Sequence, residues 1–301
     1  MPLHLKFKIS VLSLTDKTKT NAMYKVIISA CVAIVFASCE TATFIQHTPT
    51  LANTGQHTEK GQFHGNLLYS SGSSTTNNVS ISGSNDEPYQ QVNGVQAKGS
   101  YSVSNSLAIQ SSYMHSSEKG GSVNSSQKNI VYDYNRNVTE AGLAFYENLN
   151  SNNNLFIEIG TGLGLGNNKA TEVSSAMAPG GRFYNHNIFK LYLQPSIYYV
   201  SKNFCVSVGT KLSHINFNDI VTNYTAAERQ NRAITTDNKL NTSTLDFFIK
   251  FDVFLTKLPW VGFNFQTLNS SDLGNKFNTN QNDNNIGFGL SFRFDKMGEK
   301  K

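Results

Sequence analysis

The residues best suited to acid–base or nucleophilic chemistry are few and scattered along this 301-residue chain. Two serines follow His115, while His214 precedes Asp219 and a further carboxylate occurs at Asp133. A histidine can activate a serine hydroxyl or a water when a carboxylate orients its ring. The sequence has no nucleophile elbow, no phosphate-binding glycine loop and no closely spaced set of metal ligands. We therefore expect no catalytic residue, no metal site and no cofactor.

Cys39 stands in a context that favours covalent modification. Lys25 precedes twelve almost purely apolar residues, 26–37 (VIISACVAIVFA), and Ser38 and Cys39 follow them. A basic residue, a short apolar stretch and a small-residue exit are typical of a secretory signal. The ending resembles the lipobox of bacterial lipoproteins, although Phe36 stands where a leucine is usual. This resemblance implies cleavage between Ser38 and Cys39 and acylation of Cys39; the alternative is a buried segment with an unrelated cysteine.

The leader accounts for most of the basic character of the chain. We expect residues 1–38 to be removed, with Met23 as the true start. The whole chain has 25 basic and 20 acidic residues, and the leader holds five of the former and one of the latter, which leaves a net charge of +1. Beyond it, the basic residues gather only in the tail at 296–301. The sequence therefore predicts no nucleic-acid partner, and Cys205 is left without a cysteine to pair with.

From residue 61 onward, apolar residues recur at every second position in segments of about ten residues. Leu245, Phe247 and Ile249 alternate with Asp246 and Lys250, for example. This is the period of a strand with one apolar face. The pattern predicts ten strands, with eight to twelve possible, over residues 61–70, 92–103, 107–115, 139–148, 155–166, 183–200, 204–217, 244–255, 260–268 and 285–295.

The predicted connections alternate between short and long, as in an up-and-down antiparallel transmembrane β-barrel with tight periplasmic turns and long external loops. A soluble barrel or sandwich is the alternative, with the apolar face turned inward. The polar face is rich in Gly, Ser, Asn and Gln rather than Lys and Glu, which favours a narrow lumen over a water-facing surface. Residues 39–60 are polar and aperiodic, and we expect a linker there. An even strand number then places both chain ends on the periplasmic side.

By these features residues 61–295 resemble the outer-membrane β-barrel proteins of Gram-negative bacteria. The last predicted strand, 286–294 (IGFGLSFRF), ends in Phe as the closing strand does in that family, although the tail 296–301 follows it. A lipobox joined to a barrel resembles some outer-membrane proteins of Bacteroidetes. The resemblance implies location in the bacterial outer membrane, contact with its lipid, and handling by the barrel-assembly and lipoprotein-export machineries.

Charged residues on the polar face would lie inside such a barrel, where they need partners of opposite charge. Glu140 and Lys98 are further candidates for this set. The principal lumen charges are Glu158, Lys190, Lys211, Asp246, Lys250, Asp252 and Arg293.

These charges favour a salt-bridged, largely filled interior and a structural, surface-interaction or minor permeability role. A narrow porin-like channel is one alternative, because eight strands are just filled by side chains and sixteen leave a channel. A membrane-embedded hydrolase of lipid A or protein is another, since His115 and His214 resemble in part the histidines of such enzymes. The long loops are rich in Asn, Ser, Thr and Gly and identify no surface ligand.

Overall fold

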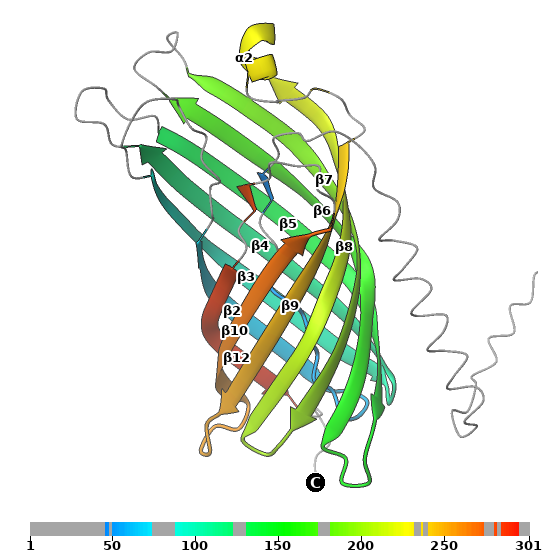
Figure 1. Cartoon of the computed structure of the whole chain (residues 1–301). Coiled ribbons are helices and arrows are strands. Elements are labelled where there is room, and N and C mark those ends of the chain that lie inside the picture. The colour runs from blue at the N-terminus through cyan, green and yellow to red at the C-terminus, as the bar shows by residue number, and fades with distance from the viewer. Residues whose placement is uncertain are drawn as a thin grey trace, which may run out of the picture. The chain divides into compact units, whose positions relative to one another are not determined.

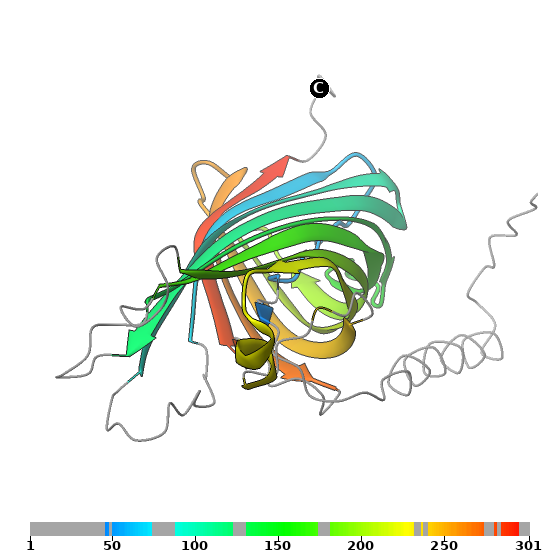
Figure 2. The same cartoon turned by 90° about the horizontal axis from the view of Figure 1, so that it is seen from above.

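The computed structural model describes residues 46–47, 50–73, 88–122, 131–173, 181–231, 236, 240–273, 280–281 and 284–294. Within these ranges ten antiparallel strands form one closed barrel (Figures 1 and 2). Strands that follow one another in the chain are neighbours, and the ladder between β12 and β2 closes the cylinder. The strands are β2 (Phe63–Ser73), β3 (Pro88–Ser104), β4 (Leu107–Ser122), β5 (Val131–Asn148), β6 (Leu155–Val173), β7 (Arg182–Val200), β8 (Phe204–Thr222), β9 (Leu240–Phe254), β10 (Val261–Asp272) and β12 (Asn284–Phe294). The prediction of an all-β up-and-down barrel of about ten strands is confirmed.

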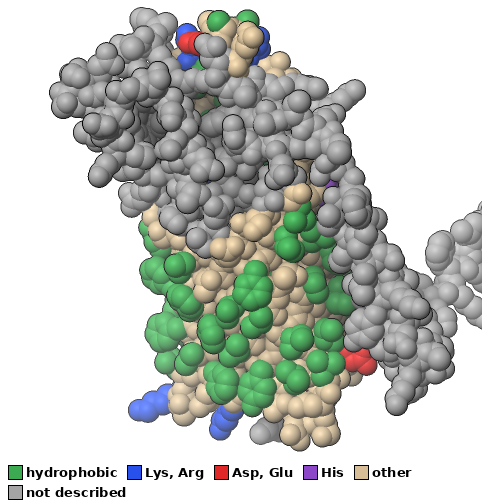
Figure 3. All heavy atoms as spheres, viewed as in Figure 1, with side chains coloured by type: hydrophobic (Ala, Val, Ile, Leu, Met, Phe, Trp, Pro, Cys, Tyr) green, Lys and Arg blue, Asp and Glu red, His purple; other side chains and the backbone are tan. Residues whose placement is uncertain are grey.

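Side chains alternate between the outside and the inside of the barrel along each strand. On β9, Leu245 and Phe247 are 39% and 47% exposed, whereas Asp246 and Phe248 are fully buried. Apolar side chains gather around the outside of the wall in Figure 3. An apolar band of this size on a closed barrel is the lipid-facing surface of a membrane protein.

Aromatic side chains mark the lower edge of this band. Phe294 stacks with both Phe63 and Trp260, with ring centroids 6.0 and 5.9 Å apart, and Tyr199 lies against Phe204. Phe63 begins the first strand of the barrel and Phe294 ends the last, whereas Tyr199, Phe204 and Trp260 lie at or beside short connections. Amphipathic rings are enriched at membrane–water interfaces. They form one aromatic girdle of the barrel.

Several strands are longer at their upper ends than the sequence predicts. β4 continues to Ser122 and β5 begins at Val131, so much of the predicted loop at 116–138 is strand. The reason is that apolar alternation reports contact with lipid, whereas the hydrogen-bonded ladder needs no particular side chain. Strands that extend past the apolar band keep their pairing but lose the sequence signal.

The connections define two different ends of the barrel. Residues 105–106, 149–154, 201–203 and 255–260 make short turns at one end, which we call the turn end. The long connections, including the one that carries the short helix α2 (Ala226–Asn231), lie at the other, the loop end. In outer-membrane barrels the short turns face the periplasm and the longer loops face outward.

Residues 50–58 (TLANTGQHT), here called the lumen segment, run through the inside of the barrel. Residues 50–57 are buried, and their side chains are at most 7% exposed. Just below them, the Lys60 amide donates to Asn105 at the turn end. Above them, the two-residue strand β1 (Gln46–His47) pairs in parallel with β11 (Asn280–Gln281), within the long connection between β10 and β12. Part of the predicted linker at 39–60 is thus interior packing, since its polar residues meet a polar wall.

The exterior position of Ile249 gives a test of the lipid-facing surface. Replacing Ile249 by Arg should lower the free energy of unfolding by roughly 2–4 kcal/mol, because a charge would enter the apolar band. Leu258→Arg is the matched control, since Leu258 lies in the turn at 255–260 and should tolerate the charge. Urea titration of the protein folded into lipid vesicles measures both. Equal stability of the Ile249 variant and the wild type would contradict the lipid-facing assignment.

Candidate functional site

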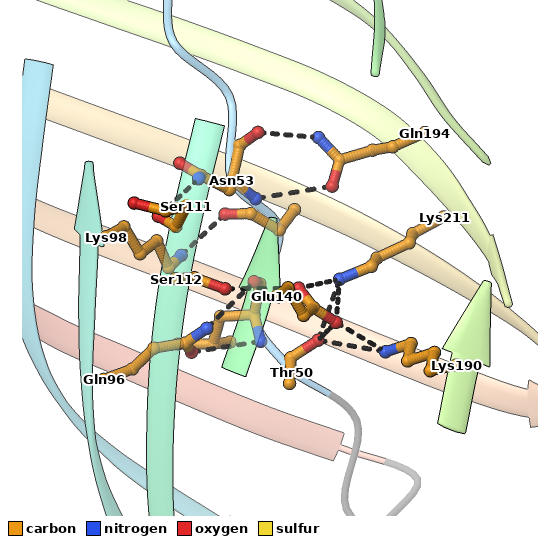
Figure 4. Close-up of polar contacts among 12 residues, drawn as sticks. Thr50, Asn53, Gln96, Lys98, Ser111, Ser112, Glu140, Lys190, Gln194 and Lys211 are labelled. Atoms are coloured by element: carbon orange, nitrogen blue, oxygen red, sulfur yellow. Dashed lines mark hydrogen bonds and ion pairs between the residues drawn. The ribbon is translucent and has the colours of Figure 1, made fainter. Parts of the chain in front are cut away.

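The most highly connected group in the barrel interior is the carboxylate of Glu140 on β5. Lys190 from β7 and Lys211 from β8 place their ammonium groups 3.0 and 2.8 Å from its oxygens. Thr50 of the lumen segment donates its hydroxyl to the same carboxylate at 2.7 Å, and Ser112 donates at 3.2 Å. Figure 4 shows these side chains converging from opposite walls. The first residue of the lumen segment is thus bound into a buried ion-pair cluster.

A glycine between two of these side chains allows them to meet. Gly164 on β6 pairs with Glu140 on one side and Lys190 on the other. A Cβ at Gly164 would lie 3.2 Å from Glu140 Cγ and 3.4 Å from Lys190 Cβ, which is tighter than normal packing. The absence of a side chain on β6 therefore lets a carboxylate and an ammonium from alternate strands pair across it.

Two glutamines hold the backbone of the lumen segment. Gln96 on β3 accepts from the Leu51 amide at 3.1 Å and donates to the Leu51 carbonyl at 3.3 Å. Gln194 on β7 does the same for Asn53, at 3.3 and 3.0 Å. A primary amide offers a donor and an acceptor side by side, so each glutamine replaces the peptide group of a neighbouring strand. Buried backbone groups that would otherwise be unpaired are thereby satisfied.

Two lysines of the wall donate to further backbone carbonyls of the lumen segment. Lys98 donates to the Ala52 carbonyl at 2.6 Å and to Gln266 at 2.7 Å. Lys250 donates to the Thr54 carbonyl at 3.0 Å and also lies 3.3 Å from Asp252. Hydrogen bonds from charged donors are among the stronger ones in proteins.

The lower part of the segment is bound to the wall by neutral groups. Tyr198 donates to the His57 carbonyl, and the His57 ring lies 2.6 Å from the Ser100 hydroxyl. Gln56 donates to Ser207 at 2.8 Å. Side chains of β3, β7 and β8 therefore enclose the segment at this level.

Apolar contacts complete the packing around Leu51. Leu51 and Ala52 cluster with the inward-facing Leu68, Phe248 and Leu268. Gly287 on β12 lies beside them, and a Cβ there would stand 2.4 Å from Leu51 Cδ1. The wall thus makes room for the Leu51 side chain by having no side chain at Gly287, which indicates specific packing of Leu51.

The structure places the predicted lumen charges at several levels of the interior. Glu158 accepts from Gln110 at 3.1 Å, and Asp246 accepts from Ser270. Asp252 accepts from Asn264 at 2.6 Å. Lys190, Lys211 and Lys250 contact the lumen segment or its partners, as do Glu140 and Lys98.

Arg293 lies near the turn end of the barrel. It donates to the Lys202 carbonyl at 3.1 Å, and its guanidinium carbon lies 4.4 Å from the centre of the Phe254 ring. Its position near the end of the last strand places it next to the turn at 201–203.

The histidines and aspartates considered for catalysis are not gathered into one site. His115 on β4 contacts Asn137, His214 on β8 contacts Ser243, and Asp133 on β5 contacts Asn135. Asp219 is exposed and accepts from Asn187. Among the residues that the structure describes, no group of three or more His, Cys, Asp or Glu side chains could hold a metal ion.

Three other findings concern the sequence expectations. In the described ranges, no helix is long and apolar enough to cross a membrane. Ser38, Cys39 and the tail 296–301 lie outside those ranges. Cys205 is buried inside the barrel as a free thiol.

Thr50, Gln96 and Gln194 are among the interior residues that sequence reasoning missed, as is the buried ion pair of Arg136 and Glu118. Alternation indicates that Gln96 and Gln194 face inward, because each lies between outward-facing neighbours. It does not reveal that both glutamines bind backbone groups of the lumen segment, which precedes the first strand of the barrel. A polar segment without Lys-rich or Pro-rich character is the one signal, and it is equally typical of an exposed linker.

At the loop end, Glu228 ties helix α2 to the barrel wall. Thr225 and Glu228 form a capping box. The Thr225 amide donates to the Glu228 carboxylate at 2.7 Å, and the Glu228 amide donates to the Thr225 hydroxyl at 3.3 Å. Arg182 at the start of β7 donates two hydrogen bonds from Nε and one from Nη2 to the same carboxylate. The Arg182 hydrogen bonds, followed by the Thr225 amide, lower the pKa of Glu228 from 4.5 to about 2.

The lowered pKa of Glu228 predicts a definite pH range for this contact. A carboxyl group with a depressed pKa contributes fully above its ordinary pKa, and the contribution is lost as the pH falls through the folded value. The contact should therefore persist at pH 4 and be lost near pH 2. NMR titration of the Glu228 carboxyl in micelles measures this midpoint. Arg182→Gln should move it toward 4.5, and an unchanged midpoint in that variant would contradict the assigned cause.

Glu140 provides the test of the interior cluster. Glu140→Gln leaves the ammonium groups of Lys190 and Lys211 buried without their counter-ion, and should cost about 3–5 kcal/mol in the free energy of unfolding. Adding Lys211→Gln should recover part of this loss, because one uncompensated charge disappears. Glu228→Gln is the exposed control and should change stability little. Urea titration in vesicles compares the four proteins, and a wild-type value for Glu140→Gln would contradict the cluster's role.

No family model and no curated protein matches the chain. Solved structures are similar to it at low sequence identity. The translocator domain of autotransporter NalP from Neisseria meningitidis has 8% identity and a TM-score of 0.47, over 92% of this chain and 97% of that one. OprG, an outer-membrane protein of Pseudomonas aeruginosa, has 7% identity and a TM-score of 0.36, over 79% and 98%. Ail, the attachment invasion locus protein of Yersinia pestis, has 12% identity and a TM-score of 0.32, over 78% and 99%.

These similarities extend to the barrel fold alone. The closed ten-strand cylinder, its apolar exterior and its polar interior are features of this chain itself. In water such an exterior would be an aggregating surface, whereas in lipid it is the required one. The chain is therefore a transmembrane β-barrel of the outer-membrane type.

Proposed function

We propose that this protein is a closed outer-membrane barrel that is anchored by lipid at Cys39 and serves a structural or surface-interaction role, with little permeability of its own. The observation that carries the proposal is the occupied interior. The lumen segment is bound by side chains of β3, β5, β7, β8, β9 and β10. An ordered chain bound inside the lumen supports a low permeability.

The acylation of Cys39 is supported by the sequence around it. The apolar stretch 26–37 and the residues that follow resemble a lipoprotein signal, as in some outer-membrane proteins of Bacteroidetes. Acyl chains add to an anchor that the barrel already provides. Partners implied by this proposal are outer-membrane lipid and the assembly and lipoprotein-export machineries. The proposal includes no enzymatic activity.

The loop end supports the surface-interaction part of the proposal. Strands extend past the apolar band there, and α2 is fixed to the wall through Arg182 and Glu228. A rigid scaffold that presents loops beyond the membrane is suited to binding partners. Its ligand has no signature in the sequence.

A narrow channel is the second candidate, favoured by one observation. The lumen segment is held by side chains rather than by membership of the wall, so its removal would expose a polar lining that includes Lys98, Lys211 and Lys250. Ten strands lie between barrels that are just filled by side chains and the wide porins. Such a channel would conduct only with the segment displaced.

Planar-bilayer recording tests the closed state. The wild-type protein should show no stable conductance steps, because the lumen segment blocks the pore. Replacing residues 50–57 by an equally long Gly/Ser sequence should produce openings, since the buried side chains of Thr50, Leu51 and His57 are lost and the flexible replacement is held through its backbone alone. Large steady currents through the wild type would overturn the proposal in favour of the channel.

A disulfide provides the matched control for segment movement. The Thr54 and Ser207 hydroxyl oxygens lie 3.4 Å apart, so Thr54→Cys with Ser207→Cys, in a Cys205→Ala background, should join the segment to β8. If spontaneous openings of the background protein occur, oxidation of this pair should abolish them and reduction should restore them. Openings that persist in the fully oxidised protein would show that the lumen segment is not the barrier.

A further inference from the structure

The direction in which the lumen segment runs can be followed against a single strand of the wall. On β3, which descends from the loop end to the turn end, His57 contacts Ser100, Ala52 contacts Lys98 and Leu51 contacts Gln96. Smaller residue numbers in the segment therefore lie farther from the turn end. Toward the amino terminus, the chain climbs through the barrel.

The upper end of this path lies next to a long connection. β1 pairs with β11, which falls between the end of β10 at Asp272 and the start of β12 at Asn284. Both of those strand ends belong to the loop end, opposite the short turn that contains Trp260. Figure 2 shows β1 inside the outline of the barrel as seen from above. At Gln46 the chain thus lies beside a connection of the loop end.

We infer that the lumen segment carries the amino end of the mature chain across the outer membrane, so that the residues preceding Gln46 are displayed on the cell surface. For the amino end, this differs from the sequence-based expectation that both chain ends are periplasmic. The expectation assumed that residues 39–60 join the first strand from the side on which that strand begins. The contacts of Thr50, Ala52 and His57 show instead that the joining segment doubles back through the barrel.

A return route to the periplasm is closed to this end of the chain. The interior is occupied by the segment itself and by buried side chains such as Lys211 and Phe248. A path outside the barrel would take unpaired backbone through hydrocarbon, where each unsatisfied group costs several kcal/mol. The chain that precedes Gln46 therefore stays on the side where it emerges.

The inference also selects a membrane leaflet, and this part rests on the proposed acylation of Cys39. Six residues lie between Cys39 and Gln46, and the seven steps along the chain span at most about 25 Å. The apolar band of a barrel is itself about 25 Å tall, so acyl chains on Cys39 reach the outer leaflet from above and not the inner one. The anchor would then be a lipid inserted from the cell surface.

An epitope inserted between residues 43 and 44 tests the inference in the full-length protein in cells. Antibody should bind this epitope on intact cells, without permeabilisation of the outer membrane. Two reference insertions calibrate the result: one in the long β8–β9 connection, between residues 233 and 234, and one in the short turn at 149–154. The first should be reached on intact cells and the second only after permeabilisation.

The pattern of the three epitopes separates the inference from the orientation on which it depends. Protection of the amino-side epitope while the β8–β9 epitope is reached would overturn the inference and leave the orientation intact. Access to the 149–154 epitope alone would instead overturn the orientation, and the inference with it. Cys39→Ala should leave the amino-side epitope accessible, because the lumen segment and not the lipid sets its position. Loss of access in that variant would mean that the lipid determines the topology, which contradicts the inference.

Discussion

The carboxylate of Glu140 is the point on which the interior of the barrel depends. It brings together two lysines of the wall and the first buried residue of the lumen segment, all within 3.0 Å. Two ammonium groups in a dry interior are tolerable only with a counter-charge and good hydrogen-bond geometry. The Tyr192 ring adds a further contact, with Lys211 Nζ 4.6 Å from its centre. The ion pairs and hydrogen bonds of Glu140 therefore join the lumen segment to the barrel wall.

Much of the wall could be predicted from the sequence, because lipid on one side and a polar interior on the other impose a strict period of two. β6 and β9 show this clearly, since Leu155 and Leu245 begin long unbroken alternations. The extended upper parts of β4 and β5 could not be predicted, because backbone pairing continues there without contact with lipid. The apolar alternation ends where the two faces of a strand are in similar surroundings, although the strand itself continues.

The contents of the barrel were harder to predict for a different reason. Inward-facing charges such as Lys190 and Lys250 follow from alternation, and their need for partners follows from burial. Their partners, however, include backbone carbonyls and the hydroxyl of Thr50, which have no distinctive sequence signature. A lone polar stretch looks the same whether it is solvated by water or by the side chains of a surrounding wall. The position of the lumen segment depends on side chains from several strands that come together only when the barrel closes. No local sequence pattern encodes this arrangement.

The seam of the barrel has a kinetic consequence. β2 and β12 are the first and last strands of the wall and pair from Phe63–Phe294 to Ser73–Asn284, so the last ladder to form joins the most distant parts of the sequence. Such closure carries the largest loop entropy and is intrinsically slow. Lys98 and Gln266 come from strands on either side of this seam, and both bind the Ala52 carbonyl as well as each other. The lumen segment is thus bound by strands that flank both sides of the seam, so the material that fills the barrel also stabilises its closed form.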